Sequence, residues 1–352
     1  MELFNTLQQI SPASDAAYQK CIARFDNIAK PIGSLGKLET LLAHICAAQH
    51  TDDADISKKC VLVFCADNGV LKQGVAQSTH DVTTAIARSL MKSTTSVSCM
   101  AKAAGADVFP VDMGMIDTVE NMENYSLGKG TNDISEGPAM SRQQAIDGIL
   151  TGIKLVGEKK SCGYNLIATG EAGIGNTTTS TAVLAALTGE SVETLCGRGS
   201  GLTDEGLIRK QNAIKKALKI NNPDKTDIID VISKVGGFDI AAMTGAFIGG
   251  ALYHIPIIMD GFISGAAAMC AVGLCKNANG YIIPSHITAE PAGQLIMEKL
   301  GFSPIIHADM RLGEGTGAVA LMPLLDLSVS VYRNAATFAK INVEAYKKWD
   351  SI

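Results

Sequence analysis

The stretch of sequence that decides the fold reads Asn165-Leu166-Ile167-Ala168-Thr169-Gly170-Glu171-Ala172-Gly173-Ile174-Gly175-Asn176-Thr177-Thr178-Thr179. It begins with a short apolar run at 165–168, continues through a loop rich in glycine and threonine, and leads into an alanine-rich segment. A short apolar run bounded by glycine is typical of a strand that is buried on both faces of a parallel sheet. The stretch therefore predicts a strand, a turn and a helix in succession.

Other apolar runs along the chain have the same form. They are Val61–Cys65, Asp107–Val111, Pro256–Met259, Tyr281–Ile283 and Ile305–His307. Helical segments rich in Ala, Met and Ile lie between most of them. This alternation predicts an α/β fold with a doubly wound, mostly parallel sheet.

The two ends of the chain are predicted to be helical. Ser11-Pro12 suits the N-cap and first turn of a helix that runs to about Ile28, and a second helix follows at 37–49. The tail at 321–349 also has a helical pattern and is expected to pack on these helices. We expect a small helical domain of 1–50 plus 321–352 and a large α/β domain of 51–320.

Composition excludes several classes of partner. Hydrophobic residues make up 47% of the 352 residues and charged residues 18%, so the chain can bury a sizeable core. The net charge is −5, and the 30 Lys and Arg are scattered along the chain. This balance gives no electrostatic reason to expect a nucleic acid or an anionic membrane as partner.

The cysteines indicate neither a metal site nor a secreted protein. There are 9 of them, none in a C-x-x-C pair and none with His at the spacing of zinc ligands. An odd number of cysteines without a secretory leader suits reduced thiols, so we expect a cytoplasmic protein. No metal or organic cofactor is expected.

The uncharged segment at 240–259 is long enough to cross a membrane. It is interrupted by Gly245, Gly249, Gly250 and Pro256. A buried helix followed by a buried strand therefore explains it better than a membrane-spanning helix does.

The glycine-rich loop at 170–179 is a candidate phosphate site. Glycines allow a ligand to approach the backbone closely, and the amides that open the next helix point at an anion. The loop has neither the Gly-Lys-[Ser/Thr] of a Walker motif nor a complete G-x-G-x-x-G. The alternative interpretation is a helix cap with tight packing.

Two later loops carry charged residues that suit the same site. Lys210 follows the loop 197–206 and could bind a phosphate as a point charge, although a solvated helix lysine would have the same spacing. Glu314 lies between two glycines in the loop 311–317, after a predicted strand. It could act as a base in an apolar pocket, or it could be a turn residue bonded to backbone amides. Together with Glu171 it would place two carboxyl groups near a sugar carbon that develops positive charge.

Seven motifs occur in order along the chain. They are Lys30-Pro31-Ile32-Gly33-Ser34-Leu35-Gly36, the loop 171–178, the loop 197–207, Gly236-Gly237-Phe238-Asp239, Asp260-Gly261-Phe262, Ser285-His286 and the loop 311–317. Together they resemble the nicotinate-nucleotide:dimethylbenzimidazole phosphoribosyltransferase (CobT) family. The resemblance extends from about residue 5 to about residue 345.

The resemblance implies a Rossmann-like large domain, a small helical domain built from both termini, and a dimer. It also implies the reaction: an aromatic acceptor displaces nicotinate at C1′ of nicotinate mononucleotide, with inversion, for cobamide biosynthesis. Glu314 matches the general base of the family, and Glu171 matches a second carboxylate. The positions implied in binding the phosphate and nucleotide are Gly173, Ile174, Gly175, Asn176, Thr177, Thr178, Gly199, Ser200, Lys210, Thr288, Leu312 and Gly313.

The acceptor loop departs from the family pattern. Ser78 keeps a position near the acceptor, whereas Ile86 stands where dimethylbenzimidazole enzymes have a glutamine that contacts the base. An apolar wall would suit phenol or p-cresol, which a two-subunit branch of the family activates through the phenolic oxygen. Alternatively, Ile86 is an ordinary substitution and the acceptor is unchanged. His80 could contact the acceptor, contact a partner chain, or simply lie on the surface.

Two rival functions remain for this sequence. The chain could be a non-catalytic partner subunit of a heterodimer rather than an active transferase that works as a homodimer or heterodimer. It could also be a nicotinamide-dependent dehydrogenase, although only the glycine loops support that interpretation. The presence of Glu171, Lys210 and Glu314 favours an active transferase.

Overall fold

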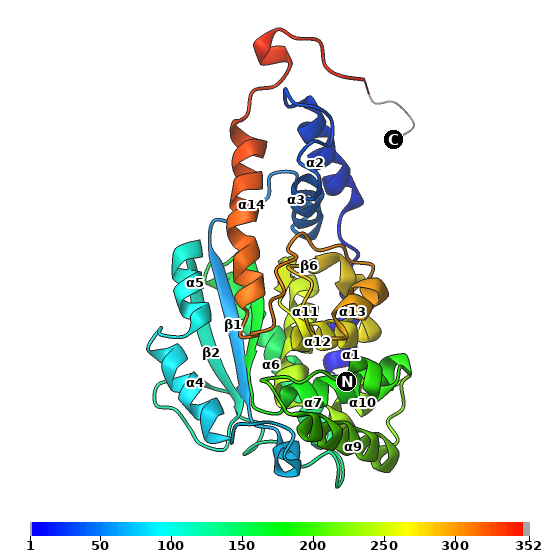
Figure 1. Ribbon diagram of the computed structural model, residues 1–352. Coiled ribbons are helices and arrows are strands. Elements are labelled where there is room, and N and C mark those ends of the chain that lie inside the picture. The colour runs from blue at the N-terminus through cyan, green and yellow to red at the C-terminus, as the bar shows by residue number, and fades with distance from the viewer. Residues whose placement is uncertain (1, 348–352) are drawn as a thin grey trace.

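A single parallel sheet organises the chain (Figure 1). The structure is a computed structural model, and it describes residues 2–347. Its sheet has six strands in the order β3-β2-β1-β4-β5-β6, and all neighbouring strands are parallel. The strands are β1 (Lys59–Ala66), β2 (Ala106–Gly114), β3 (Glu123–Asn124), β4 (Leu166–Ala172), β5 (Ile257–Met259) and β6 (Ile282–Pro284). This arrangement confirms the predicted α/β class.

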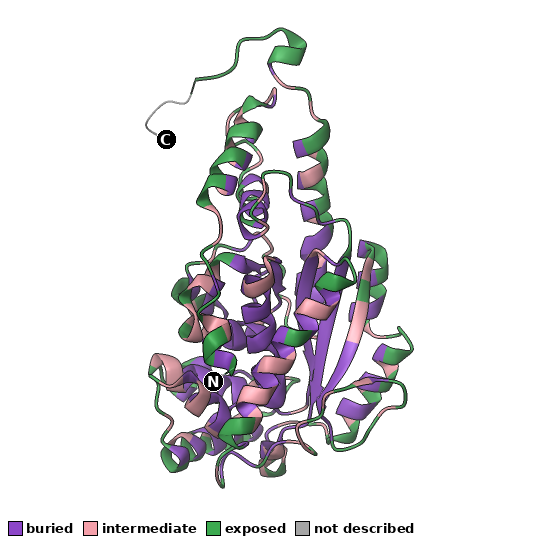
Figure 2. Cartoon of the chain, turned by 180° about the vertical axis from the view of Figure 1, so that it is seen from behind, coloured by how far each residue is buried: buried purple, intermediate pink, exposed green. Residues whose placement is uncertain are grey.

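Strand β1 shows why the middle of a strand carries an unbroken apolar run. Its eight residues are all buried (Figure 2). Side chains alternate along a strand, so Leu62 and Phe64 pack into the core on one face of the sheet. Val61 and Val63 pack into the core on the other face. Because both faces are covered, no polar position interrupts the run.

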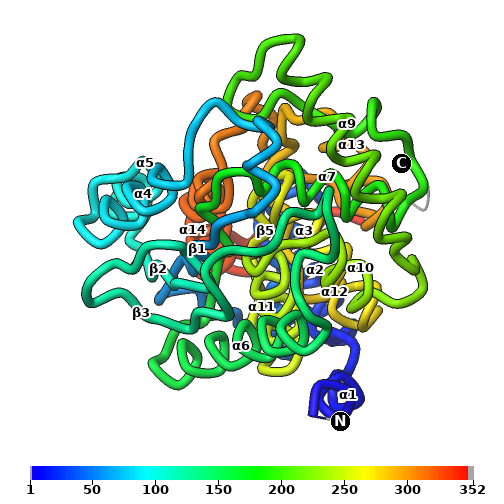
Figure 3. The backbone as a smooth tube through the Cα atoms, turned by 90° about the horizontal axis from the view of Figure 1, so that it is seen from below, coloured from blue at the N-terminus to red at the C-terminus, as the bar shows by residue number. Residues whose placement is uncertain are grey.

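One face of the sheet is covered by α6 (Arg142–Ser161), α7 (Asn176–Thr188), α10 (Ile228–Val235), α11 (Phe238–Tyr253) and α12 (Phe262–Leu274). In this layer α6 and α11 lie side by side (Figure 3). Glycine makes that close contact possible, since a Cβ at Gly152 would lie 2.0 Å from the carbonyl oxygen of Ala242. The other helices on the same core are α1 (Glu2–Leu7), α8 (Val192–Leu195), α9 (Asp204–Asn221) and α13 (Gly293–Leu300).

The opposite face is covered by α4 (Asp81–Met91), α5 (Ser96–Ala104) and α14 (Thr316–Asn334). Helix α14 continues beyond the sheet and stands beside α2 (Asp15–Asn27) and α3 (Lys37–Ala48), as Figure 1 shows. Ser328 Oγ donates to the carbonyl of Leu38 at 2.9 Å, which ties α14 to α3. The predicted domain boundary at residue 321 lies inside α14, so no break in the chain marks it. The division into two domains stays a prediction.

Both terminal helices differ from the predicted bounds. Helix α2 begins after Ser14, whose Oγ accepts from the N–H of Ala17 at 3.2 Å, and not at Ser11. The helix predicted at 321–349 ends at Asn334, because Thr337 pairs with Ile28 in an isolated β-bridge that draws the chain into an extended path. Within 335–347 only the short 3-10 helix η3 (Ala339–Ile341) follows. Trp349 lies outside the described residues.

The sheet differs from the predicted one at its two edges. The run at 305–307 forms a single bridge, between Ile306 and His286, and is not a strand of the sheet. Strand β3 was not predicted, because its two residues are half-buried and exposed and carry no apolar signal. The uncharged segment at 240–259 forms most of α11 and then β5, as predicted. No helix within residues 2–347 has the length and hydropathy needed to span a bilayer.

Candidate active site

A cavity of about 190 Å³ lies at the carboxyl ends of the central strands. Ligands bind at this edge in open α/β folds, where the strand order reverses around the first strand. Its wall is formed mainly by the turn after β4, the loop 198–200, the segments after β5 and β6, and the turn before α14, with Val75, Ala76 and Ile86 completing it. The predicted site residues on the wall are Ile86, Glu171, Gly173, Ile174, Gly175, Asn176, Thr177, Gly199, Ser200, Thr288, Leu312, Gly313 and Glu314.

The turn after β4 brings the backbone against the cavity. Strand β4 extends to Ala172, so Glu171 is the end of a strand and not a loop residue as predicted. Gly173 must be glycine, because a Cβ there would lie 2.3 Å from the carbonyl oxygen of Ala66. Gly175 caps α7 with φ 96° and no side-chain hydrogen bond. The N–H groups of Asn176 and Thr178 donate to the carbonyls of Gly173 and Gly175 at 3.1 and 2.9 Å, and the positive end of α7 at this turn favours an anion.

The turn before α14 has an unusual backbone. Gly313, Glu314 and Gly315 have φ values of 88°, 62° and 94°, so three successive residues lie in the left-handed region. That conformation is unfavourable for a glutamate. Asp260 holds the turn, since its carboxylate accepts from the N–H of Gly315 at 3.1 Å and from the N–H of Ala318 at 3.0 Å. The turn therefore fixes the position of the Glu314 backbone.

The Glu314 carboxyl group lines the cavity and has one oxygen without a partner in the described part of the chain. Its Oε2 atom is buried and has no hydrogen-bond partner among the described residues. Burial raises the pKa of Glu314, and the backbone amide of Val97 offsets part of that rise. A raised pKa favours a carboxylate as a base near neutral pH. The role of Glu314 as a base stays a prediction.

The Glu171 carboxyl group, in contrast, is held by the protein. It is buried, and it accepts from the side-chain amide of Asn176 and from the N–H of Glu314, the latter at 3.4 Å. Burial, followed by the nearby charge of Asp239, raises the pKa of Glu171 well above its usual range. Burial therefore raises the pKa of both glutamates, and that of Glu171 more strongly.

Lys210 is not the solvated lysine that its spacing allowed. It is 1% exposed, and burial lowers its pKa. Its ammonium group donates to Thr177 Oγ1 at 2.8 Å and to the carbonyl of Gly197 at 3.1 Å. Lys210 is thus placed behind the cavity wall, where it joins the start of α7 to the loop 197–201. Its role in phosphate binding stays a prediction.

The predicted acceptor residues fall into two cavities. Ile86 lines the cavity that also contains both glutamates. Ser78 and His80 line a neighbouring cavity of about 470 Å³, and Ala76 lies on the wall of both. Thr178 is buried beside these walls but lines neither cavity.

Comparisons with known proteins place the chain in a family. The sequence model of a family described as "Phosphoribosyltransferase" matches residues 10–343. A curated relative from Acetivibrio thermocellus, named nicotinate-nucleotide–dimethylbenzimidazole phosphoribosyltransferase, is 44% identical over 347 residues, which are 98% of this chain and 99% of the relative. The chain belongs to this family.

Further relatives agree with this assignment. A family member of the same name from Clostridium acetobutylicum is 41% identical over 99% of both chains. The crystal structure of CobT from Thermus thermophilus superimposes with a TM-score of 0.89 at 30% identity, covering 94% of this chain and 99% of that one. The chain is therefore a phosphoribosyltransferase, a kind of pentosyltransferase, and not the dehydrogenase that its glycine loops also allowed.

Several cavity residues were not predicted as site residues. They are Arg198, Asp260, Ser264, His286, Glu290 and Arg311. A usable signal existed for Asp260 and His286, because each follows within two residues of a buried strand, β5 and β6. Burial raises the pKa of Asp260 and lowers that of His286. Within residues 2–347 no cluster of His, Cys, Asp and Glu could hold a metal ion.

Proposed function

We propose that this chain transfers the 5-phosphoribosyl group of nicotinate mononucleotide to dimethylbenzimidazole, the acceptor named for its relatives. The reaction would release nicotinate and give an α-riboside phosphate for cobamide biosynthesis. One observation carries the proposal: an unpartnered carboxylate oxygen of Glu314 and the N-terminus of α7 face the same cavity. A base and an anion site in one cavity suit attack on a phosphorylated sugar.

The proposed chemistry is a displacement at C1′. One nitrogen of the acceptor attacks C1′ while Glu314 takes the proton from the other nitrogen. The bond from C1′ to the pyridinium nitrogen breaks and its electron pair stays on that nitrogen. Nicotinate therefore leaves with an uncharged pyridine ring. Attack from the side opposite the leaving group gives the α configuration. Holding both reactants in one cavity supplies much of the rate enhancement.

The phosphate of the nucleotide would bind at the turn after β4. The positive end of α7 and the hydroxyl of Thr177 would favour an anion there. Lys210 would act through Thr177, to which it donates a hydrogen bond. Arg198 and Arg311 lie on the same cavity wall and would balance the charge of the phosphate.

A second acceptor class, phenol or p-cresol, is supported by Ile86. Its apolar side chain lines the cavity that contains Glu314 and offers no hydrogen-bond partner to a ring nitrogen. A phenol has an unperturbed pKa of about 10, so it depends on a base more than an imidazole does. With a phenolic acceptor, Glu314 takes the hydroxyl proton and the phenolic oxygen attacks C1′. The chain would then work beside a paralogous subunit, and otherwise as a homodimer.

Product analysis with the purified chain alone tests these proposals. Nicotinate mononucleotide is supplied with a mixture of dimethylbenzimidazole, phenol and p-cresol. We expect the benzimidazole riboside phosphate, whereas phenolic ribosides would establish the second acceptor class. Ile86→Gln, measured in parallel, should raise the preference for dimethylbenzimidazole roughly five- to ten-fold, the value of one added hydrogen bond. Product only after mixing with a paralogous subunit would identify a partner subunit, and no product with any acceptor or partner would contradict the proposal.

A further inference from the structure

The carboxyl group of Glu171 is connected to a second buried carboxyl group that does not reach the cavity. Asp239 lies in the first turn of α11, is 0% exposed, and is absent from the cavity wall. The side-chain amide of Asn176 donates to Glu171 Oε2 and also to Asp239 Oδ2, the latter at 3.2 Å. One amide group therefore bridges two acids that lie 68 positions apart in the sequence, 239 − 171.

We propose that Asp239 is a positioning residue, which does not reach the cavity itself but holds the carboxyl group of Glu171 in place through the side-chain amide of Asn176 and through its own nearby charge. Its effect on turnover rests on the proposed function. The contact with Glu171 itself does not, because the bridge is present in the protein without substrate.

Local packing favours this role over simple helix capping. Asp239 Oδ1 accepts from the N–H of Ile240 at 2.9 Å, which satisfies the start of α11. That bond leaves Oδ2 directed at Asn176. Gly237 makes room for the carboxylate, since a Cβ there would lie 2.3 Å from Asp239 Oδ1. A capping residue alone would not need to be buried beside another acid.

The bridge also has a consequence for protonation. Two buried carboxyl groups that share a site cannot both ionise easily. Burial raises the pKa of Asp239 to about 6, and burial together with Asp239 raises the pKa of Glu171 well above its ordinary value. The pair therefore holds a proton more readily than either acid would alone, and the larger rise in pKa falls on Glu171. A protonated Glu171 can donate a hydrogen bond to a ligand in the cavity, which a carboxylate cannot.

Other titratable groups face this pair. Asp260 and the Glu314 turn approach Glu171, and Asp67 approaches Asp239. Burial raises the pKa of the Cys65 thiol well above its usual range, so this group stays neutral near the pair. Only Asp239 shares a hydrogen-bond donor with Glu171 among the described residues. Its replacement should therefore have an effect that replacing more distant acids does not.

The first experiment is a carboxyl ¹³C NMR titration of the ligand-free protein, with Glu171→Gln used to assign the Glu171 signal. Asp239→Asn removes the neighbouring charge and should lower the pKa of Glu171 by about one unit or more. Asn176→Ser removes the bridging donor and should move the pKa of Glu171 in the opposite direction, upward, because that donor stabilises the ionised form. General loosening of the site would instead lower the pKa in both variants.

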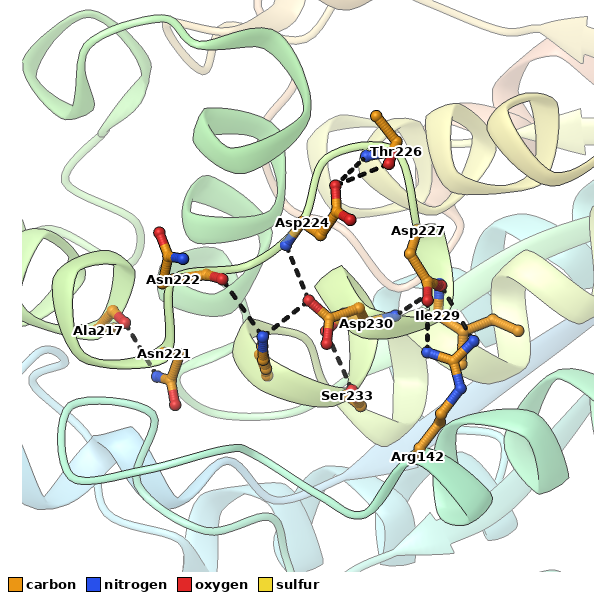
Figure 4. Close-up of polar contacts among 11 residues, drawn as sticks. Arg142, Ala217, Asn221, Asn222, Asp224, Thr226, Asp227, Ile229, Asp230 and Ser233 are labelled. Atoms are coloured by element: carbon orange, nitrogen blue, oxygen red, sulfur yellow. Dashed lines mark hydrogen bonds and ion pairs between the residues drawn. The ribbon is translucent and has the colours of Figure 1, made fainter.

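A matched control is available at the start of α10. Asp227 also accepts from two backbone N–H groups of a helix, those of Ile229 and Asp230, both at 3.1 Å (Figure 4). It pairs with Arg142 at 2.7 Å and lies away from the cavity. Asp227→Asn should leave the titration of Glu171 unchanged, which separates the bridge from the loss of any helix-capping charge.

The second experiment measures how kcat depends on pH. In the wild type the alkaline limb reports loss of the proton from Glu171. Asp239→Asn should move that limb to lower pH by about one unit or more, with KM for nicotinate mononucleotide changed less than about two-fold. Glu171→Gln should remove the limb, because glutamine remains a donor at every pH.

The outcomes separate the two proposals. An unchanged Glu171 titration in Asp239→Asn overturns the bridge, whatever the activity. A shifted titration with an unmoved alkaline limb overturns the positioning role in the reaction. If the wild type forms no product with any acceptor, the proposed function is wrong and the predicted shift of the alkaline limb cannot be measured. The NMR titration of Glu171 still decides whether Asp239 controls its pKa.

Discussion

Two turns at the edge of the sheet have nearly the same backbone but hold their glutamates differently. Gly175 caps α7 with φ 96° and ψ −9°, and Gly315 caps α14 with φ 94° and ψ 9°. Before α14 the glutamate lies within the turn, with φ 62°. Before α7 the glutamate lies four residues earlier, on strand β4. The result is one carboxyl group with an unpartnered oxygen and one that is hydrogen-bonded on both oxygens.

The amides of the two helices also differ in use. At α14 the carboxylate of Asp260 accepts from the N–H groups of Gly315 and Ala318, so the positive end of that helix is already neutralised. At α7 no comparable side chain caps the first turn among the described residues. One turn is therefore suited to orient a base, and the other to bind a phosphate. Under the proposed function, the same local backbone would support two different chemical tasks.

The largest effect is expected from Glu314→Gln. This change keeps the size of the side chain and removes only its ability to accept a proton. We expect kcat to fall by about 10²- to 10⁴-fold, the usual contribution of a general base. Binding of nicotinate mononucleotide, measured by calorimetry, should stay within about two-fold of the wild type.

A pH profile checks the same role. Because burial raises the pKa of Glu314, the wild type should lose kcat/KM as the pH falls through that raised pKa, where the base becomes protonated. Glu314→Gln should lack this acidic limb. Turnover by Glu314→Gln close to that of the wild type would exclude Glu314 as the base.

A smaller effect is expected at the contact between the two turns. Gly313 has φ 88°, and a Cβ there would lie 2.4 Å from Glu171 Oε1. Gly313→Ala should therefore displace Glu171 in addition to straining the backbone. A misplacement on the order of 1 Å can reduce kcat by up to about 100-fold. Steady-state kinetics of the folded variant measure this loss.

Gly301 provides the control for backbone strain. It has φ 71°, and no atom lies within 4 Å of the position of an added Cβ. Gly301→Ala should lose about 1 kcal/mol of unfolding free energy in urea, as an unfavourable left-handed alanine does, and keep its kcat. Equal losses of kcat in both variants would mean that the contact between Gly313 and Glu171 has no catalytic importance.

The packing of the two turns against each other also explains what the sequence could and could not predict. Apolar runs bounded by glycine located five of the six strands, because burial of both faces leaves a local signal. The sequence placed Glu171 in a loop, since Gly170 reads as a turn residue. In the structure Gly170 is within β4, and a Cβ there would lie 2.3 Å from the carbonyl oxygen of Glu314. That glycine accommodates a segment more than a hundred residues away, which no local pattern reveals.

The candidate site divides in the same way. Glu314 and the turn after β4 were predictable, because glycines and a carboxylate follow strands directly in the sequence. The bridge from Glu171 through Asn176 to Asp239 was not, since its members come from β4, α7 and α11. Ser78 and His80 were assigned to the acceptor together with Ile86, yet they line a neighbouring cavity. Ala76 lies on the wall of both cavities, and the separation of the two cavities depends on tertiary packing that no local pattern reveals.

The smallest effect on turnover is expected from Glu171→Gln. Because burial raises the pKa of Glu171 well above its usual range, glutamine resembles its protonated form in charge and in the capacity to donate a hydrogen bond. We expect kcat at neutral pH to fall less than about ten-fold, against the far larger loss in Glu314→Gln. Losses of similar size in both variants would mean that the two turns do not divide the work between a base and a neutral donor.

The stability of Glu171→Gln gives a sharper test, because its sign depends on pH. A carboxyl group whose pKa is raised on folding stabilises the protein below its unfolded pKa of about 4.5, and this contribution is lost as the pH rises towards the folded pKa. Glutamine does not titrate, so the variant should gain stability relative to the wild type as the pH increases, by about 1.4 kcal/mol for each unit between the two pKa values. Urea unfolding of both proteins from about pH 5 to about pH 8 measures this difference. A difference that stays constant over that range would show that Glu171 is ionised in the folded protein, and the contrast between the two turns would then lie in their hydrogen bonds alone.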